Sequence, residues 1–251
     1  MGENTKIAWC DHTFNPWWGC TKVSDGCANC YAEGVASRFA PGLWGPSGRR
    51  RFFGDKHWAE PVKWNRKAER DGVRRKVFCG SMCDVFEVHH SSHPDQLRQQ
   101  AEWLRLGKLI DDTPHLDWLL LTKRPEHIGR FMWGALIPDN IWLGTTAENQ
   151  EQTDKRLPEL LRWRKNTLFV SCEPLLGPVS IEVGAGNFPD WVITGAESGR
   201  RARTMYEDWV RALRDECNAA GVPFFYKQRL DDGRKVEMPE LDGRMWGEFP
   251  R

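Results

Sequence analysis

The stretch Trp118-Leu-Leu-Leu121 is an unbroken apolar run that ends directly in the polar cluster Thr122-Lys123-Arg124. A short run of branched and aromatic residues, followed by a helical pattern, is typical of a parallel strand buried on both faces. The same arrangement recurs along the chain. Similar runs lie at residues 77–80, 141–144, 168–170, 191–193 and 223–226, and an earlier strand is expected within residues 13–18.

Helical patterns fill the segments between these runs. After Pro94, for example, Leu97, Ala101 and Leu104 are spaced as on one face of a helix. Alternation of strands and helices predicts an α/β fold with a parallel sheet and right-handed crossovers. About seven strands, without a Gly-x-Gly-x-x-Gly phosphate turn, favour a closed or partly open parallel (β/α) barrel over a flat doubly wound sheet.

The barrel is predicted to take up the whole chain, residues 1–251, as a single domain. Residues 41–75 are rich in Gly, Pro, Arg and Trp without clear periodicity, so we expect an irregular insertion over the barrel mouth. The tail at residues 229–251 is predicted to be polar and loop-like.

The insertion is also the candidate nucleic-acid grip. Trp44, Trp58 and Trp64 are interleaved with Lys56 and the arginines at positions 49–51. A protein whose net charge is near zero needs stacking aromatic residues and local basic clusters to bind a nucleic-acid strand. Loop anchoring by the tryptophans is the alternative.

Composition limits the class of protein. Lys and Arg number 36 against 35 Asp and Glu, a net charge of +1, so no global field recruits nucleic acid. The N-terminus has no apolar core of a signal peptide, and no apolar run approaches membrane-spanning length. Eight cysteines in such a chain indicate metal or redox use in a reducing compartment. We expect no membrane association and a cytoplasmic location, in the host cytoplasm if the gene is carried by a phage.

Three cysteines share one short loop, Cys20, Cys27 and Cys30, with the spacing C-x6-C-x2-C. Three thiolates can ligate three irons of a [4Fe–4S] cluster and leave the fourth iron open to another ligand. An open iron is what binding of S-adenosylmethionine (SAM) requires. A structural zinc site that combines the last two of these cysteines with Cys79 and Cys83 is the alternative. It leaves Cys20 without a role, so the iron–sulfur cluster is favoured.

Polar residues follow the apolar runs, where a parallel barrel builds its active site. For each of them, capping the next helix is the alternative role. Glu173 is less easily assigned to a cap because Pro174 follows it. The candidates are Ser81, Asp84, Thr122, Lys123, Glu148, Asn149, Ser171, Glu173, Glu197 and Lys227.

The cysteine loop and these strand ends resemble the radical SAM superfamily and, more closely, a phage and prophage family marked by a three-cysteine motif. The resemblance runs nearly the full length of the chain. It implies an incomplete barrel, a [4Fe–4S] cluster, SAM, an external electron donor and, as is common in that family, a partner protein encoded nearby. The matching motifs lie at residues 19–33, 80–86, 120–125, 142–144, 171–178, 195–199 and 222–228.

The superfamily resemblance also implies roles for individual residues. The SAM amino group would be held around Ser81 to Asp84, its carboxylate by Thr122 and Lys123, and its ribose by Glu148 or Asn149. The superfamily commonly has C-x3-C-x2-C with an aromatic residue before the third cysteine. Here Asn29 holds that position, and Tyr31 after it is the candidate for the adenine contact. Ser171 completes the cofactor-binding set, and the candidates for catalysis are Glu173, Glu197 and Lys227.

Three functions follow. The first is a radical SAM enzyme that abstracts hydrogen from a nucleobase, expected to be one that is hypermodified in phage DNA and extruded from the stack. The second is repair of damaged DNA or modification of RNA by the same chemistry. The third is a zinc-stabilised nucleic-acid-binding module without catalysis.

Overall fold

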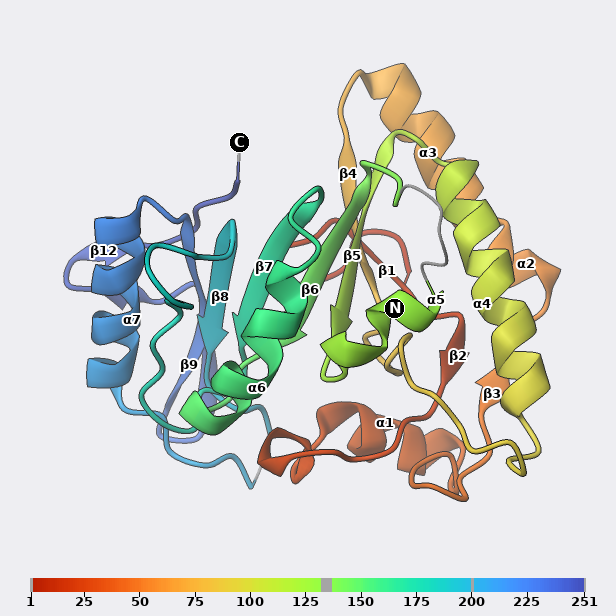
Figure 1. The fold of residues 1–251 in the computed structure, drawn as a ribbon, viewed down its shortest axis with the longest axis horizontal. Coiled ribbons are helices and arrows are strands. Elements are labelled where there is room, and N and C mark those ends of the chain that lie inside the picture. Colours follow the sequence, from red (N-terminus) through yellow and green to blue (C-terminus); the bar gives the residue numbers. More distant parts are fainter. Residues whose placement is uncertain (1, 132–136, 200, 251) are drawn as a thin grey trace. The chain divides into compact units, whose positions relative to one another are not determined.

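Strands and helices alternate along the chain in the computed structural model, which describes residues 2–131, 137–199 and 201–250 (Figure 1). The main sheet has the strand order β1-β4-β5-β6-β7-β8-β9-β10. The pairs β1–β4, β4–β5, β7–β8 and β8–β9 are parallel, whereas β9 and β10 are antiparallel. This mostly parallel sheet with helical crossovers confirms the predicted partial (β/α) barrel.

The chain divides into two compact units, and the division passes through both the cysteine loop and β6. The first unit comprises Met1–Val23 and Ala32–Trp142. Its three parallel strands are in register through Thr13, Phe78 and Leu119. Its elements are β1 (His12–Phe14), β2 (Trp17–Trp18), α1 (Tyr31–Phe39), β3 (Arg51–Phe52), α2 (Asp55–Trp58), α3 (Glu60–Asp71), β4 (Arg75–Cys79), α4 (Gln96–Asp111), β5 (Leu116–Thr122) and α5 (Ile128–Phe131).

Aromatic side chains build the core of the first unit. The Phe14 ring lies 5.1 Å from the Trp58 ring and 5.7 Å from the Trp118 ring, in edge-on geometries. Trp118 is fully buried. Helix α3 contacts β4 and β5, and Figure 1 shows it beside α4 along the same strands. Two helices therefore cover this part of the sheet.

The second unit comprises Ser24–Tyr31 and Leu143–Arg251. Every residue of β8 is buried, and so are five of the six residues of β7, as the unbroken apolar runs predict. Helix α6 packs on β7 and helix α7 on β9. Its elements are β6 (Ile141–Thr146, which begins in the first unit), α6 (Gln150–Leu161), β7 (Thr167–Cys172), β8 (Trp191–Gly195), α7 (Glu207–Ala220), β9 (Phe224–Asp231), β10 (Arg234–Glu237), β11 (Glu240–Leu241) and β12 (Arg244–Met245).

Residues 41–75 are more regular than predicted. Helices α2 and α3 occupy most of their second half, and the side chains of Trp58 and Trp64 are buried. The buried positions of α3 are Pro61, Trp64, Asn65 and Ala68, which is helical spacing interrupted by one polar residue. The predicted irregular insertion is therefore wrong from residue 55 to residue 71, and two of its three tryptophans are core residues.

The tail also differs from the predicted loop. It continues β9, adds β10 and ends in the β11–β12 hairpin. Both hairpins turn at an Asp-Gly pair with positive φ at both residues: 49° and 75° at Asp232-Gly233, and 56° and 77° at Asp242-Gly243. This is the type I′ signature, in which glycine tolerates the left-handed conformation. The prediction of a loop-like tail at 229–251 is wrong for this reason.

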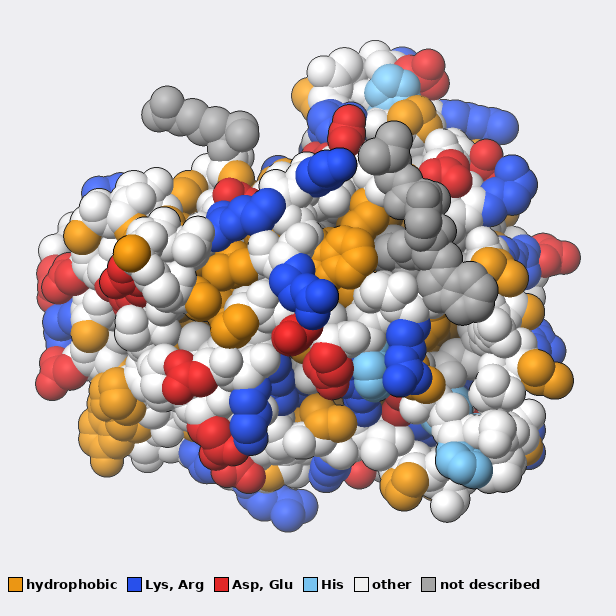
Figure 2. Space-filling view, in the orientation of Figure 1, with side chains coloured by type: hydrophobic (Ala, Val, Ile, Leu, Met, Phe, Trp, Pro, Cys, Tyr) orange, Lys and Arg blue, Asp and Glu red, His pale blue; other side chains and the backbone are white. Residues whose placement is uncertain are grey.

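Charges of both signs are mixed on the face that Figure 2 displays, in keeping with the net charge of +1. None of the helices in the described ranges combines the length and the apolar character that crossing a bilayer requires.

Candidate functional site

The three cysteines of the loop are free thiols, and each is half-buried. Cys20 belongs to the first unit, whereas Cys27 and Cys30 belong to the second. Within the described ranges no three His, Cys, Asp or Glu side chains are gathered as a metal site. The donor chemistry nevertheless fits a [4Fe–4S] cluster, because three accessible thiols that are not tied up in disulfides are the ligands such a cluster takes.

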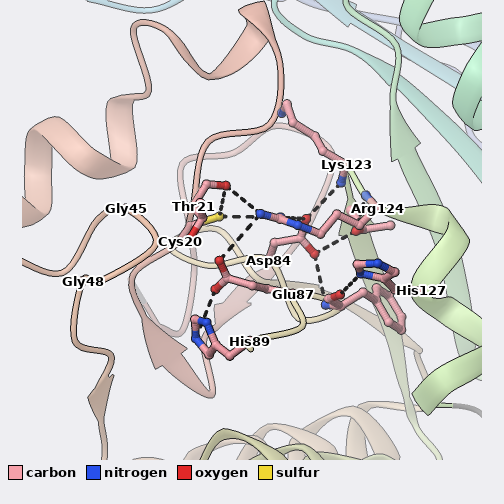
Figure 3. Close-up of polar contacts among 12 residues, drawn as sticks. Cys20, Thr21, Gly45, Gly48, Asp84, Glu87, His89, Lys123, Arg124 and His127 are labelled. Carbon is pink, nitrogen blue, oxygen red and sulfur yellow. Dashed lines mark hydrogen bonds and ion pairs between the residues drawn. The ribbon is translucent and has the colours of Figure 1, made fainter. Parts of the chain in front are cut away.

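Asp84, just beyond β4, organises the end of the neighbouring strand (Figure 3). Its Oδ1 accepts a hydrogen bond of 2.7 Å from the Thr122 hydroxyl, and its Oδ2 accepts 2.8 Å and 3.1 Å bonds from Arg124 Nη1 and the Lys123 amide. The side chain is buried. A carboxylate with this many donors is a fixed anchor. Asp84 therefore positions its neighbours, and contact with SAM stays a prediction.

Arg124 connects that anchor to the cysteine loop. Its Nη2 donates to the Thr21 carbonyl at 2.6 Å, and its Nη1 approaches Cys20 Sγ to 3.9 Å (Figure 3). Burial raises the pKa of the Cys20 thiol to about 12, and nearby carboxylates add to the rise, while Arg124 opposes it. The guanidinium is thus the favourable partner of a Cys20 thiolate in this unit.

A second buried ion pair supports the same segment. Arg50 Nη2 and Nε donate to Glu87 at 3.0 Å and 3.1 Å, and both side chains are almost fully buried. Arg50 Nη1 also donates to the carbonyls of Leu43 and Gly48, and Nη2 to the Thr21 hydroxyl. One arginine therefore ties residues 43–48 to the cysteine loop and to the segment after β4.

These contacts overturn part of the predicted nucleic-acid grip. Arg50 is buried, and Arg49 is held by the Asp95 carboxylate at 2.8 Å. Arg51 is exposed and lies over the rings of Trp18 and Phe53, at 5.1 Å and 5.6 Å. Of the three consecutive arginines, Arg50 is buried and the exposed Arg49 is paired with Asp95, so this run is not a free basic patch.

His89 lines a cavity of about 460 Å³ in the first unit, together with Thr21, Arg124 and Glu87. Its ring stacks on His93 at 3.8 Å, and its Nε2 lies 3.8 Å from Glu87 Oε2. Burial lowers the pKa of His89 to about 4. The folded protein therefore keeps this imidazole neutral at pH values where the unfolded chain binds a proton.

We expect this depressed pKa to make unfolding depend on pH. Unfolded His89 takes up a proton near pH 6.5 and the folded form near pH 4, so stability falls as the pH drops through that window. The loss is about 2–3 kcal/mol. Urea unfolding at several pH values should show that the free energy of unfolding depends less steeply on pH in His89→Gln than in the wild type. His90→Gln, which changes an exposed histidine on the same segment, should match the wild type. Equal slopes for all three proteins would contradict this account.

In the second unit Glu148, beyond β6, holds the middle of the cysteine loop. Its carboxylate is fully buried, pairs with Arg156 at 2.7 Å and accepts bonds from the Ser24 hydroxyl and the Gly26 amide. A Cβ at Gly26 would lie 2.8 Å from Glu148 Cδ, so the close approach requires glycine. Glu148 thus positions the loop, and contact with a ribose stays a prediction.

Glu197, beyond β8, holds the segment between the last two cysteines. Its Oε2 accepts 2.9 Å from Asn29 Nδ2 and 3.0 Å from Arg203 Nε, and its Oε1 lies 2.5 Å from Arg203 Nη2. Hydrogen bonds from Arg203 and Asn29 outweigh burial and lower the pKa of Glu197. Asn29, the residue before the third cysteine, therefore helps to anchor the loop.

Glu173 and Lys227 lie on either side of β8. Glu173 follows β7, Lys227 belongs to β9, and the Nζ–Oε1 distance is 2.8 Å. Glu173 Oε1 is buried, and apart from this ion pair no partner is found for it among the described residues. A Cβ at Gly195 would lie 2.8 Å from Glu173 Oε1, so the glycine of β8 lets the two side chains meet. The pair presents a donor and an acceptor side by side.

Comparison with known proteins identifies the family. The chain matches, over residues 4–250, the family described as "Protein of unknown function (DUF5131)". It is a DUF5131 protein. No curated protein matches this DUF5131 chain.

The DUF5131 chain is similar to solved structures of spore photoproduct lyase. One single-residue variant gives a TM-score of 0.54 at 10% identity, with 88% of this chain and 75% of that chain covered. A second variant, with dinucleoside spore photoproduct, gives the same TM-score, identity and coverage. At this identity the likeness shows the fold, a partial barrel, and nothing finer.

The other predicted site residues of this DUF5131 protein have varied surroundings. Asn149 accepts a 3.0 Å bond from the Gln152 amide and so caps α6, the alternative considered for strand-end residues. Ser81 accepts from Asn15 at 2.9 Å, and the Ser171 hydroxyl lies 3.5 Å from Glu173. Tyr31 begins α1 and is half exposed. Their roles toward SAM stay predictions.

Three arginines of the DUF5131 site had no predicted role. Arg124, Arg156 and Arg203 bind the strand-end carboxylates and also the cysteine loop, at the Thr21 carbonyl, the Ser24 hydroxyl and the Asp25 carbonyl. Arg124 belongs to the polar cluster 122–124, which the sequence places at the end of a strand, but no role is predicted for it. Nothing in the sequence around Arg156 distinguishes it from an exposed helix residue.

Proposed function

We propose that this DUF5131 protein is a radical SAM enzyme that acts on a nucleobase of a nucleic acid. The observation that carries the proposal is that side chains beyond strands of the sheet hold the cysteine loop within each unit. Arg124 binds the segment at Cys20, and Glu148 and Glu197 bind the segment from Ser24 to Asn29. The carboxyl ends of parallel strands are where barrel enzymes build their sites.

Cys20, Cys27 and Cys30 would ligate a [4Fe–4S] cluster. When bound with SAM and given an electron by an external donor, such a cluster splits SAM into methionine and a radical that abstracts a carbon-bound hydrogen. The carboxylates of Asp84, Glu148 and Glu197 already have partners, so their role here is to fix the loop. Lys123 and Thr122, which are hydrogen-bonded to Asp84, are the candidates for binding the SAM carboxylate.

The Glu173–Lys227 pair supports a nucleobase as substrate. The Lys227 ammonium can donate to a ring carbonyl, and the Glu173 carboxylate beside it can accept from the adjacent ring N–H. Adjacent carbonyl and N–H groups form the lactam edge of several nucleobases. A similar fold in a lyase solved with a dinucleoside photoproduct favours such a substrate. Extrusion of the base would expose this edge.

Nucleoside profiling by mass spectrometry tests this function. The anaerobically reconstituted protein should be reduced and incubated with SAM and with phage DNA, irradiated DNA or RNA in separate arms. We expect one arm to yield a new or a lost nucleoside. The arm that responds separates hypermodification, repair and RNA modification. No change in any arm, with SAM cleaved all the same, would contradict a nucleobase substrate.

Substitution of Lys227 should reduce that product formation. Lys227→Met removes a charged donor to the base, a loss of about 1.5–3 kcal/mol, so kcat/KM should fall by about ten- to a hundredfold. The matched control is Lys235→Gln on the neighbouring strand β10, where an exposed lysine pairs with Glu237. It should behave as the wild type. An unchanged kcat/KM for Lys227→Met would remove this pair from the site.

A further inference from the structure

We propose that Arg124 tunes the reduction potential of the cluster, through the charge and the N–H groups that it presents to Cys20. Its Nη1 lies 3.9 Å from Cys20 Sγ, and its side chain is 8% exposed. The inference rests on the proposed function, because it assumes that Cys20 is a cluster ligand.

The position of the guanidinium is strongly determined. Asp84 holds Nη1 at 2.8 Å, the Thr21 carbonyl holds Nη2 at 2.6 Å, and the Arg124 amide donates 2.8 Å to the Thr122 hydroxyl. The same hydroxyl donates to Asp84, so backbone and side chain of Arg124 share one anchor. A side chain held at this many points keeps its distance to Cys20 when the cysteine gains negative charge.

The carboxylates that oppose Arg124 at the sulfur, Glu87 and Asp84, are themselves paired with arginines. Glu87 lies 3.6 Å from Arg124 Nη2, but both its oxygens accept from Arg50. Arg50 and Arg124 thus balance Glu87 and Asp84 in number. Of these four side chains, Arg124 is seen in contact with Cys20 Sγ. Figure 3 shows contacts from the Arg124 guanidinium to the Cys20 sulfur and to the Asp84 carboxylate.

Physical chemistry gives the sign of the effect. Reduction adds an electron to the cluster and so raises the negative charge on its sulfurs. A buried cation and N–H donors at a ligating sulfur favour that state, and hydrogen bonds to sulfur are among the determinants of cluster potentials. Arg124 should therefore make the potential less negative and the electron easier to accept from the external donor.

The test is a potentiometric titration followed by electron paramagnetic resonance of the reconstituted protein. We expect Arg124→Gln to shift the equilibrium constant for reduction at least tenfold toward the oxidised cluster, which for one electron is 59 mV. Arg124→Lys, which keeps the charge, should shift less. Arg98→Gln removes an exposed arginine of α4 in the same unit and should leave the potential unchanged.

A second measurement does not depend on the variant folding. Protein labelled with ¹⁵N in arginine alone should show a ¹⁵N coupling to the reduced cluster in pulsed electron paramagnetic resonance. A cluster whose potential is the same in wild type and Arg124→Gln, or which shows no ¹⁵N coupling, would overturn this inference and leave the proposed function intact. Wild-type protein that binds no four-iron cluster would overturn both.

Discussion

Replacing Cys20, Cys27 and Cys30 together by alanine is expected to abolish iron binding. The anaerobic wild-type protein should carry about four irons per chain and be brown, because three thiolates ligate the cube. The triple variant loses every protein ligand, so its iron and sulfide content should fall to background. Both quantities can be measured colorimetrically after reconstitution under identical conditions.

The matched control for this experiment is Cys10→Ala. Cys10 is also a half-buried free thiol, but it lies outside the cysteine loop. Its Sγ contacts the Ile7 carbonyl at 3.9 Å. It should retain the full iron content. Iron that persists in the triple variant, or a wild-type protein that holds zinc in place of iron, would contradict the assignment of the three cysteines.

Glu148→Ala is expected to cause the largest loss of stability among single substitutions in the second unit. It leaves the buried Arg156 guanidinium without its carboxylate and frees the Ser24 hydroxyl and the Gly26 amide. Removing one partner of a buried ion pair costs about 3–5 kcal/mol. Urea unfolding should show this loss as a lower midpoint with little change in slope.

The control for Glu148 lies on the same helix as its partner. Glu151→Ala removes an exposed i,i+4 ion pair with Lys155 on α6, where the expected cost is about 0.5 kcal/mol or less. If Glu148→Ala costs no more than Glu151→Ala, the buried network does not hold the cysteine loop. The argument for Glu148 as an anchor would then be wrong.

The strands could be predicted because a parallel strand that is buried on both faces has a recognisable sequence pattern, a short and unbroken apolar run. The runs at 118–121, 168–170 and 191–193 lie within observed strands, and the run at 77–80 ends one residue beyond β4. The helix predicted after Pro94 is present as α4, but Leu97 and Leu104, whose spacing suggested it, are exposed. Its buried face is carried instead by Trp103, Leu106 and Ile110, with polar residues between them.

The roles of site residues could not be predicted as well as their positions. Glu148 and Asn149 are neighbours beyond β6, yet one is a buried loop anchor and the other a helix cap. The arginines at 49, 50 and 51 likewise lie in three different environments. Such differences depend on which residue, distant in the sequence, contacts the side chain in the folded protein. The local sequence around a residue does not identify that contact.

The central claim is that the cysteine loop of this protein supports reductive cleavage of SAM. The most direct measurement is chromatographic detection of 5′-deoxyadenosine after the reconstituted protein is reduced with dithionite in the presence of SAM. We expect the wild type to form 5′-deoxyadenosine and methionine, and the variant without Cys20, Cys27 and Cys30 to form neither. A wild-type protein with its full iron content that leaves SAM intact would contradict the account.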